Sequence, residues 1–154
     1  MFTKILAACD GSKHARAALN QAVDIARAEK ASLTILTSYS TVLTWPGVGF
    51  GALSQTVFDE LMASARADAQ KVVDEAVATL PPGMTAATKL IDGPAAEAIL
   101  TEAREGGYDL IAVGSRGRGD VGSMFLGSVS HRVLHNCHLP VLVVTDPGAP
   151  GPAT

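Results

Sequence analysis

Short apolar segments alternate with amphipathic segments along nearly the whole chain, and this alternation restricts the possible folds more than any other feature. Five segments are short and apolar enough to be buried strands, and they cover residues 4–9, 32–37, 85–91, 108–113 and 139–145. Four segments between them repeat apolar residues at helical spacing, over residues 13–30, 56–80, 95–105 and 128–135. The predicted order is therefore βαβαβαβαβ.

Near-continuous apolar strands that alternate with helices indicate a parallel sheet covered on both faces. Because crossover connections are right-handed, the expected fold class is α/β, a doubly wound, Rossmann-like sheet of five parallel strands. Ligands of such sheets bind beyond the carboxyl ends of the strands, where the strand order reverses. The turn Asp10-Gly11-Ser12 after the first strand and the turn that begins at Gly114 after the fourth are expected to line this crevice.

Length and composition predict one domain over residues 1–146 and a flexible Pro/Gly-rich tail over residues 147–154. Residues 40–54 are predicted to form a long loop. The net charge of −3 argues against a nucleic-acid partner. No apolar run approaches the roughly 18 residues of a membrane span, and the first residues lack a signal-peptide pattern. We therefore expect a cytoplasmic protein with no membrane partner.

The glycine-rich turn after the fourth strand carries the strongest functional signal. It begins as Gly114-Ser115-Arg116-Gly117, and after nine further residues Gly127-Ser128 leads into the last helix. Glycine lets backbone N–H groups approach a ligand, and a helix N-terminus favours negative charge. Arg116 and Arg118 add cationic donors, and the hydroxyls of residues 128 and 130 can donate as well. The pattern predicts a phosphate cradle and so a nucleotide site. The alternative is a turn that only connects strand to helix, which would not need so many glycines and arginines.

Two common phosphate-binding motifs fit this region poorly. Gly117 to Gly122 matches G-x-G-x-x-G, but the dinucleotide fingerprint belongs after the first strand. Gly122 to Ser128 resembles a P-loop without the Lys that reaches the β- and γ-phosphates. Neither motif is therefore adopted.

The spacing G-x2-G-x9-G-[S/T] is similar to that of the universal stress protein family, in its ATP-binding branch. The resemblance covers roughly residues 1–145 and includes Asp10, the Asp92-Gly93-Pro94 turn and the run Pro140 to Val144. It implies that ATP is bound and that its triphosphate is held by the residues of this spacing and those that follow on the helix, which are Gly114, Gly117, Gly127, Ser128, Val129 and Ser130.

The same resemblance implies roles for the rest of the predicted site. Asp10 is expected near the ribose and adenine, and Thr37 and Ser38 are expected to flank the adenine. Gly11, Ser115 and Arg116 complete the set of predicted binding residues. Family members usually form homodimers through the last strand, here Val141 to Val144, which would otherwise be an apolar edge.

Structural roles compete with binding roles for several of these residues. An Asp between a strand and a helix often caps the helix, so Asp10 could cap, bind ribose or do both. Ser12 is predicted to cap the first helix. His14, in the first turn of that helix, could lie near a ligand, but the favoured prediction is that it faces solvent. Cys9, on a central strand, is predicted to be buried.

A metal site is not predicted. His131 and His135 share one face of the last helix, and Cys137 and His138 are close in sequence. The zincin motif, however, needs Glu at the position where Arg132 stands.

The predicted site lacks the groups that fast phosphoryl transfer needs. No general base is evident beside the phosphate loop, and the Walker Lys is missing. Asp10 could hold Mg²⁺ on phosphate oxygens. We expect a nucleotide-responsive regulator of the stress response, with at most slow ATP hydrolysis. The alternatives are a slow ATPase or nucleotidyl-transfer enzyme on the same sheet, and an interaction module whose pocket stays empty.

Overall fold

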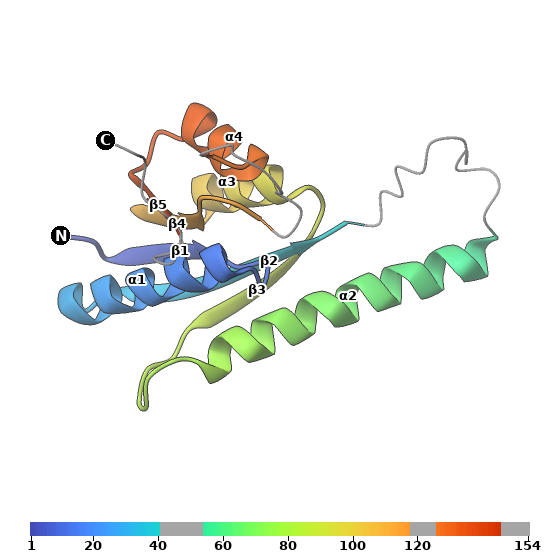
Figure 1. The fold of residues 1–154 in the computed structure, drawn as a ribbon, viewed down its shortest axis with the longest axis horizontal. Helices are drawn as coiled ribbons and strands as arrows, with labels where there is room; N and C mark the ends of the chain where they lie inside the picture. Colours follow the sequence, from blue (N-terminus) through green and yellow to red (C-terminus); the bar gives the residue numbers. More distant parts are fainter. Residues whose placement is uncertain (41–53, 118–125, 146–154) are drawn as a thin grey trace.

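The computed structural model describes residues 1–40, 54–117 and 126–145. Its strands form one five-stranded parallel sheet in the order β3-β2-β1-β4-β5 (Figure 1). The strands are β1 (Lys4–Ala8), β2 (Ser32–Tyr39), β3 (Ala87–Asp92), β4 (Leu110–Gly114) and β5 (Val141–Val144). The helices are α1 (Lys13–Glu29), α2 (Gln55–Ala78), α3 (Ala95–Glu105) and α4 (Ser128–Asn136). The predicted alternation and the doubly wound α/β class are confirmed.

The strand order reverses at β1, which lies at the centre of the sheet between β2 and β4. Ile5 pairs with Leu33 of β2 on one side and with Leu110 of β4 on the other. The carboxyl ends of β1 and β4 therefore lie side by side, as predicted for the switch point of a doubly wound sheet. Arg118, the predicted tail over residues 147–154 and most of the predicted loop over residues 40–54 lie outside the described residues.

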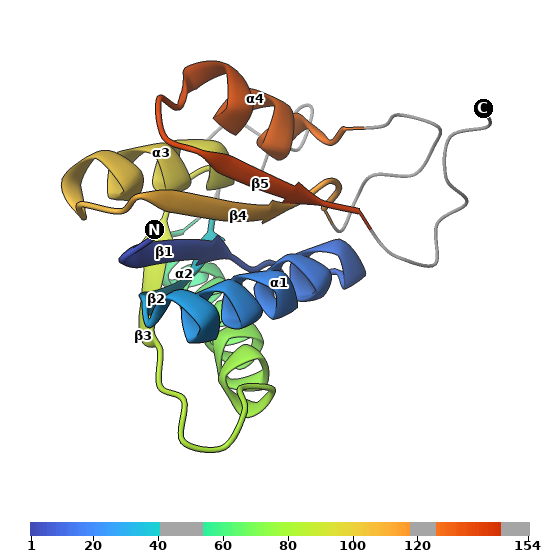
Figure 2. The ribbon, with the colours of Figure 1, turned by 90° about the vertical axis from the view of Figure 1, so that its left-hand side faces the viewer.

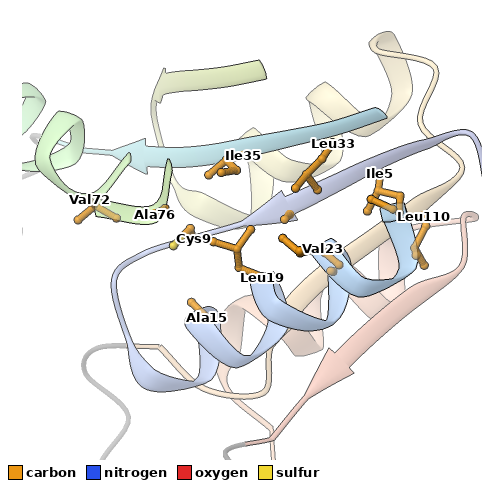
Figure 3. Packing of buried hydrophobic residues seen from close by; sticks show 14 residues of the cluster. Ile5, Cys9, Ala15, Leu19, Val23, Leu33, Ile35, Val72, Ala76 and Leu110 are labelled. Carbon is orange, nitrogen blue, oxygen red and sulfur yellow. The ribbon is translucent and has the colours of Figure 1, made fainter. Parts of the chain in front are cut away.

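Helices cover both faces of the sheet, because successive side chains of each central strand point to opposite sides. Ile5 and Ile35 belong to a core shared with α1 and α2, whereas Leu6, Leu36 and Ile111 belong to a core shared with α3 and α4. Figure 1 shows α1 and α2 below the sheet and α3 and α4 above it. In the first core, side chains of α1 and α2 pack against those of the strands (Figure 3). None of the described helices is long and apolar enough to cross a membrane.

The bounds of all five strands differ by one or two residues from the prediction, and two of these differences have identifiable reasons. β2 continues through Ser38 and Tyr39, because these residues pair with Ile91 and Asp92 of β3. β5 begins only at Val141, because Pro140 has no N–H to donate to a sheet. The Pro140 carbonyl still accepts a hydrogen bond from Ile111 N–H at 3.0 Å. β5 is an edge strand, bonded to β4 on one side (Figure 2).

Candidate functional site

A pocket of about 360 Å³ lies at the carboxyl ends of β1 and β4, where the strand order reverses. Residues from the turns after these strands, from the end of β2 and from the first turn of α4 line it. The predicted binding residues in its lining are Asp10, Ser38, Gly114, Arg116, Gly117, Gly127, Ser128, Val129 and Ser130. Gly11 and Ser115 are absent from the lining. One cavity thus brings together residues from both ends of the chain.

The turn after β1 is ordered by its own polar side chains. Asp10 Oδ1 accepts a hydrogen bond from Ser12 N–H at 2.8 Å, and Gly11 between them has a φ of 82°, a left-handed conformation that glycine adopts readily. The N-cap of α1 is Ser12, whose hydroxyl accepts from Ala15 N–H at 3.2 Å. Ser12 therefore caps the helix as predicted, whereas the helix-capping role considered for Asp10 is wrong. The Asp10 side chain stabilises the turn and lines the pocket.

Glycine is required at position 114 for a reason other than ligand approach. A Cβ atom at Gly114 would lie 2.6 Å from the carbonyl carbon of His14 and 2.7 Å from the backbone nitrogen of Ala15. The first turn of α1 therefore packs directly on the end of β4. At Gly117 a Cβ atom would instead meet Asp10 Oδ2 at 3.1 Å, within the pocket. The Asp10 carboxylate thus faces the glycine turn.

Ser115 is buried beside the pocket and uses its backbone to anchor the turn. Its N–H donates to the carbonyl of Val144 in β5 at 2.8 Å. Its carbonyl accepts from Gly127 N–H at 2.6 Å and from the Ser130 hydroxyl at 3.1 Å. Its Oγ lies 3.2 Å from His14 Nδ1, so His14 does not simply face solvent as predicted. Ser115 therefore connects β5, α1 and the residues that begin α4.

The first turn of α4 has one serine whose hydroxyl is bonded inside the protein and one serine that is exposed to solvent. Ser130 is 2% exposed, and its hydroxyl lies within hydrogen-bond distance of the carbonyls of Ser115 and Gly127. The Ser130 hydroxyl thus supports the turn, and the Ser128 side chain is exposed at the helix start. The N–H groups of a helix's first turn have no partner within the helix, so this turn can receive an anion.

Part of the pocket lining is apolar. Leu36, Val113, Ala95 and Ile99 form this apolar wall, and Cys9, which is buried as predicted, also lines the pocket. The Cys9 carbonyl accepts from the Thr37 hydroxyl at 2.8 Å, so Thr37 stabilises the end of β1 from inside the core. Sequence patterning does not single out Ala95 and Ile99 of α3 as pocket residues, because their small and apolar side chains match ordinary core positions.

The lining of the pocket has a polar part and an apolar part. Among the described lining residues, Asp10 and Arg116 carry the charged side chains. Glycine backbone, Arg116 and the start of α4 form a polar end suited to an anion, and the apolar wall suits a flat ring. The described residues contain no group of three or more potential metal ligands. His131 and His135 lie with ring centroids 4.4 Å apart on the exposed side of α4.

The fold and the pocket define the class of this protein: a doubly wound α/β protein with a ligand pocket where the strand order reverses. The sequence model of the universal stress protein family matches residues 1–145. The chain belongs to the universal stress protein family.

Similar proteins are known from several bacteria. Universal stress protein YxiE of Bacillus subtilis is 36% identical over 147 residues, which cover 94% of this chain and 99% of that protein. A universal stress protein of Thermus aquaticus is 40% identical over 144 residues, again 94% and 99% of the two chains. The solved structure of UspA from Lactobacillus plantarum superposes with a TM-score of 0.75 at 26% identity, covering 92% of this chain and 97% of that one. The five-stranded sheet is therefore the fold of this family.

Proposed function

We propose that this protein binds ATP in the pocket at the switch point and acts as a nucleotide-responsive regulator in the stress response. The observation that carries the proposal is the convergence of Asp10, the Gly114–Gly117 turn and the start of α4 on one cavity. These groups come from turns far apart in the sequence, and a phosphate chain needs several N–H donors in one place.

The two ends of the pocket fit the two ends of a nucleotide. The triphosphate would lie against Gly117, Arg116 and the N–H groups of α4, and the adenine against the apolar wall with Ser38 at its edge. Asp10, whose Oδ2 faces Gly117, would lie beside the phosphates or the ribose. A carboxylate beside a triphosphate is unfavourable unless a cation offsets the charge, and Asp10 could hold Mg²⁺ through one oxygen, since Mg²⁺ keeps most of its waters.

Nucleotides in two proteins of the same fold support this assignment. One is a universal stress protein in complex with cAMP, at 22% identity and a TM-score of 0.59. The other is the Arabidopsis thaliana protein At3g01520 with AMP bound, at 18% identity and a TM-score of 0.69. Both ligands carry adenine and a phosphate, which are the two features that the divided pocket would receive.

The lining favours binding over fast chemistry. The pocket holds the carboxylate of Asp10 and the guanidinium of Arg116, but its described lining has neither a Lys nor a His side chain. The competing candidate is a slow ATPase or a nucleotidyl-transfer enzyme on the same sheet.

We further propose a homodimer through β5, an edge strand of valines and one leucine. The cytoplasmic location stays a prediction.

The first experiment identifies the ligand. Protein purified without added nucleotide is denatured, and the released small molecules are identified by mass spectrometry. Emptied protein is then titrated with ATP and AMP in a calorimeter, with and without Mg²⁺. We expect ATP to bind more tightly than AMP, because each charge-assisted hydrogen bond to the β- and γ-phosphates contributes about 1.5–3 kcal/mol. Equal affinities would remove the proposed role of the cradle.

Variants test where the nucleotide lies. Gly117→Val and Gly127→Val should abolish ATP binding and keep the far-UV circular dichroism of the wild type, because a branched side chain would fill the phosphate space. Ala67→Val on the exposed face of α2 is the matched control. Normal binding by both glycine variants would place the nucleotide elsewhere. ADP or nucleotidyl product that accumulates over hours and is lost in the same variants would favour the enzyme.

A further inference from the structure

A side-chain contact joins the two turns that form the polar end of the pocket. His14, in the first turn of α1, places Nδ1 at 3.2 Å from Ser115 Oγ, in the turn after β4. The two residues are 101 positions apart in the sequence. Ser115 is 2% exposed and His14 is half-buried, so the contact lies largely out of solvent, where a hydrogen bond is stronger.

The backbones of both partners are also held by other contacts. The backbone of Ser115 is bonded to Val144 and Gly127, which leaves its hydroxyl directed at α1. The backbone of His14 is packed on Gly114, where even one added carbon would lie within 2.6 Å. A hydrogen bond between groups already fixed by their surroundings loses little further conformational entropy.

The residues on either side of this contact line the pocket. Arg116 and Gly117 follow Ser115 directly, and Asp10 lies four positions before His14. The contact therefore connects the segment that follows Asp10 to the turn that carries Arg116 and Gly117. The apolar wall from α3 is not part of this connection.

We propose that the His14–Ser115 hydrogen bond is a clasp that positions these two turns for the phosphate chain of the nucleotide, with His14 as a positioning residue. This inference rests on the proposed function. It adds to that function a residue, His14, that positions the two turns at the polar end of the pocket, where the phosphates would bind. Because the clasp acts on the phosphate end alone, its loss weakens ATP more than AMP.

The test is a double-mutant cycle on nucleotide affinity, with the full chain and Mg²⁺ present. His14→Ala and Ser115→Ala each remove the clasp, and we expect each to reduce ATP affinity about five- to tenfold. The double variant should lose no more than either single variant. His14→Asn, whose amide can occupy the position of Nδ1, should retain most of the affinity. His135→Ala, an exposed histidine on α4, is the matched control and should bind as the wild type does.

The ratio of ATP to AMP affinity separates positioning from general stability. The clasp predicts a lower ratio in both alanine variants, whereas a fold that is merely loosened would weaken both nucleotides equally. Additive losses in the double variant, an unchanged ratio, or a His14→Asn variant as weak as His14→Ala would each overturn the clasp while leaving ATP binding in place. A wild-type chain that does not bind ATP would overturn the proposed function and the clasp together.

Discussion

At the scale of single residues, the glycines of one turn have different tasks. Gly114 lies under the backbone of His14 and Ala15, so its missing side chain lets α1 pack on β4. Gly117 lies three positions later and faces the Asp10 carboxylate inside the pocket. The first glycine serves the fold, and the second serves the site. Sequence spacing alone could not separate these tasks, because both positions belong to the same motif.

A matched pair of alanine variants tests this division. Gly114→Ala should lower the free energy of unfolding by about 2 kcal/mol, because backbone atoms at 2.6 and 2.7 Å have to move. Gly117→Ala should lower it by less than about 1 kcal/mol, because the neighbour at 3.1 Å is the end of a side chain. Its main effect should be on ATP affinity. Chemical denaturation and calorimetric titration measure the two quantities, and equal destabilisation by both variants would contradict the assignment.

At the scale of elements, Asp109 fixes the position of β1 against β4. Its carboxylate accepts hydrogen bonds from Thr3 N–H at 2.7 Å, from the Thr3 hydroxyl at 2.6 Å and from Lys4 N–H at 3.0 Å. These bonds, with the Thr3 hydroxyl first, hold the pKa of Asp109 below its ordinary value of 3.8. The start of the central strand is thus tied to the start of its neighbour by one charged group.

Asp109→Asn should therefore destabilise the protein in a pH-dependent way. Because the pKa is lowered in the folded state, the carboxylate contributes stability fully above pH 3.8 and loses it as the pH falls through the folded pKa. At pH 7 we expect a loss of about 1 kcal/mol, since the group is partly exposed to solvent. In thermal unfolding the difference between the two proteins should be constant near neutral pH and should begin to shrink once the pH falls below 3.8. A constant difference from pH 7 to pH 3 would argue against the ionised form as the stabilising species.

The elements themselves were predictable from the sequence, because each strand and helix carries its own period of apolar residues. The switch point also followed from the predicted alternation, and it located the two turns of the pocket. What could not be predicted depends on contacts between distant segments. The pairing of Ser38 and Tyr39 with β3, the contact of His14 with Ser115 and the inward-turned hydroxyl of Ser130 each need a partner that only the folded chain supplies.

At the scale of the whole molecule, β5 is the feature that bears on assembly. Its four residues are half-buried, and Val141 and Val143 pack on the core beneath α3 and α4. The strand is bonded to β4 on one side and lies at the edge of the described sheet on the other (Figure 2). Two copies of such an edge can meet antiparallel about a two-fold axis.

Val143→Lys should weaken this predicted dimer, because a charge would be placed beside the seam. Analytical ultracentrifugation at micromolar concentration should show a dimer for the wild type and a larger monomer fraction for the variant. Val57→Lys, at a position on α2 that is 40% exposed, is the control for the added charge. Because Val143 also packs on its own core, circular dichroism has to confirm that the variant is folded. A monomeric wild type would end the dimer proposal.

The central position of β1 also affects how the sheet can form during translation. Among the described strands β1 is synthesised first, yet one of its two partners, β4, follows only after β2, α2, β3 and α3. The Thr3–Asp109 bond closes a separation of 106 positions, which at roughly 5–20 residues per second corresponds to about 5–20 s of translation. During this interval we expect a half-sheet of β1, β2 and β3 to expose one bare edge of β1, and pulsed proteolysis of stalled nascent chains would reveal whether that edge stays open. Until β4 is added, β1 therefore has one unpaired edge at the future ligand pocket, and the site forms only after β4 and the start of α4 have emerged.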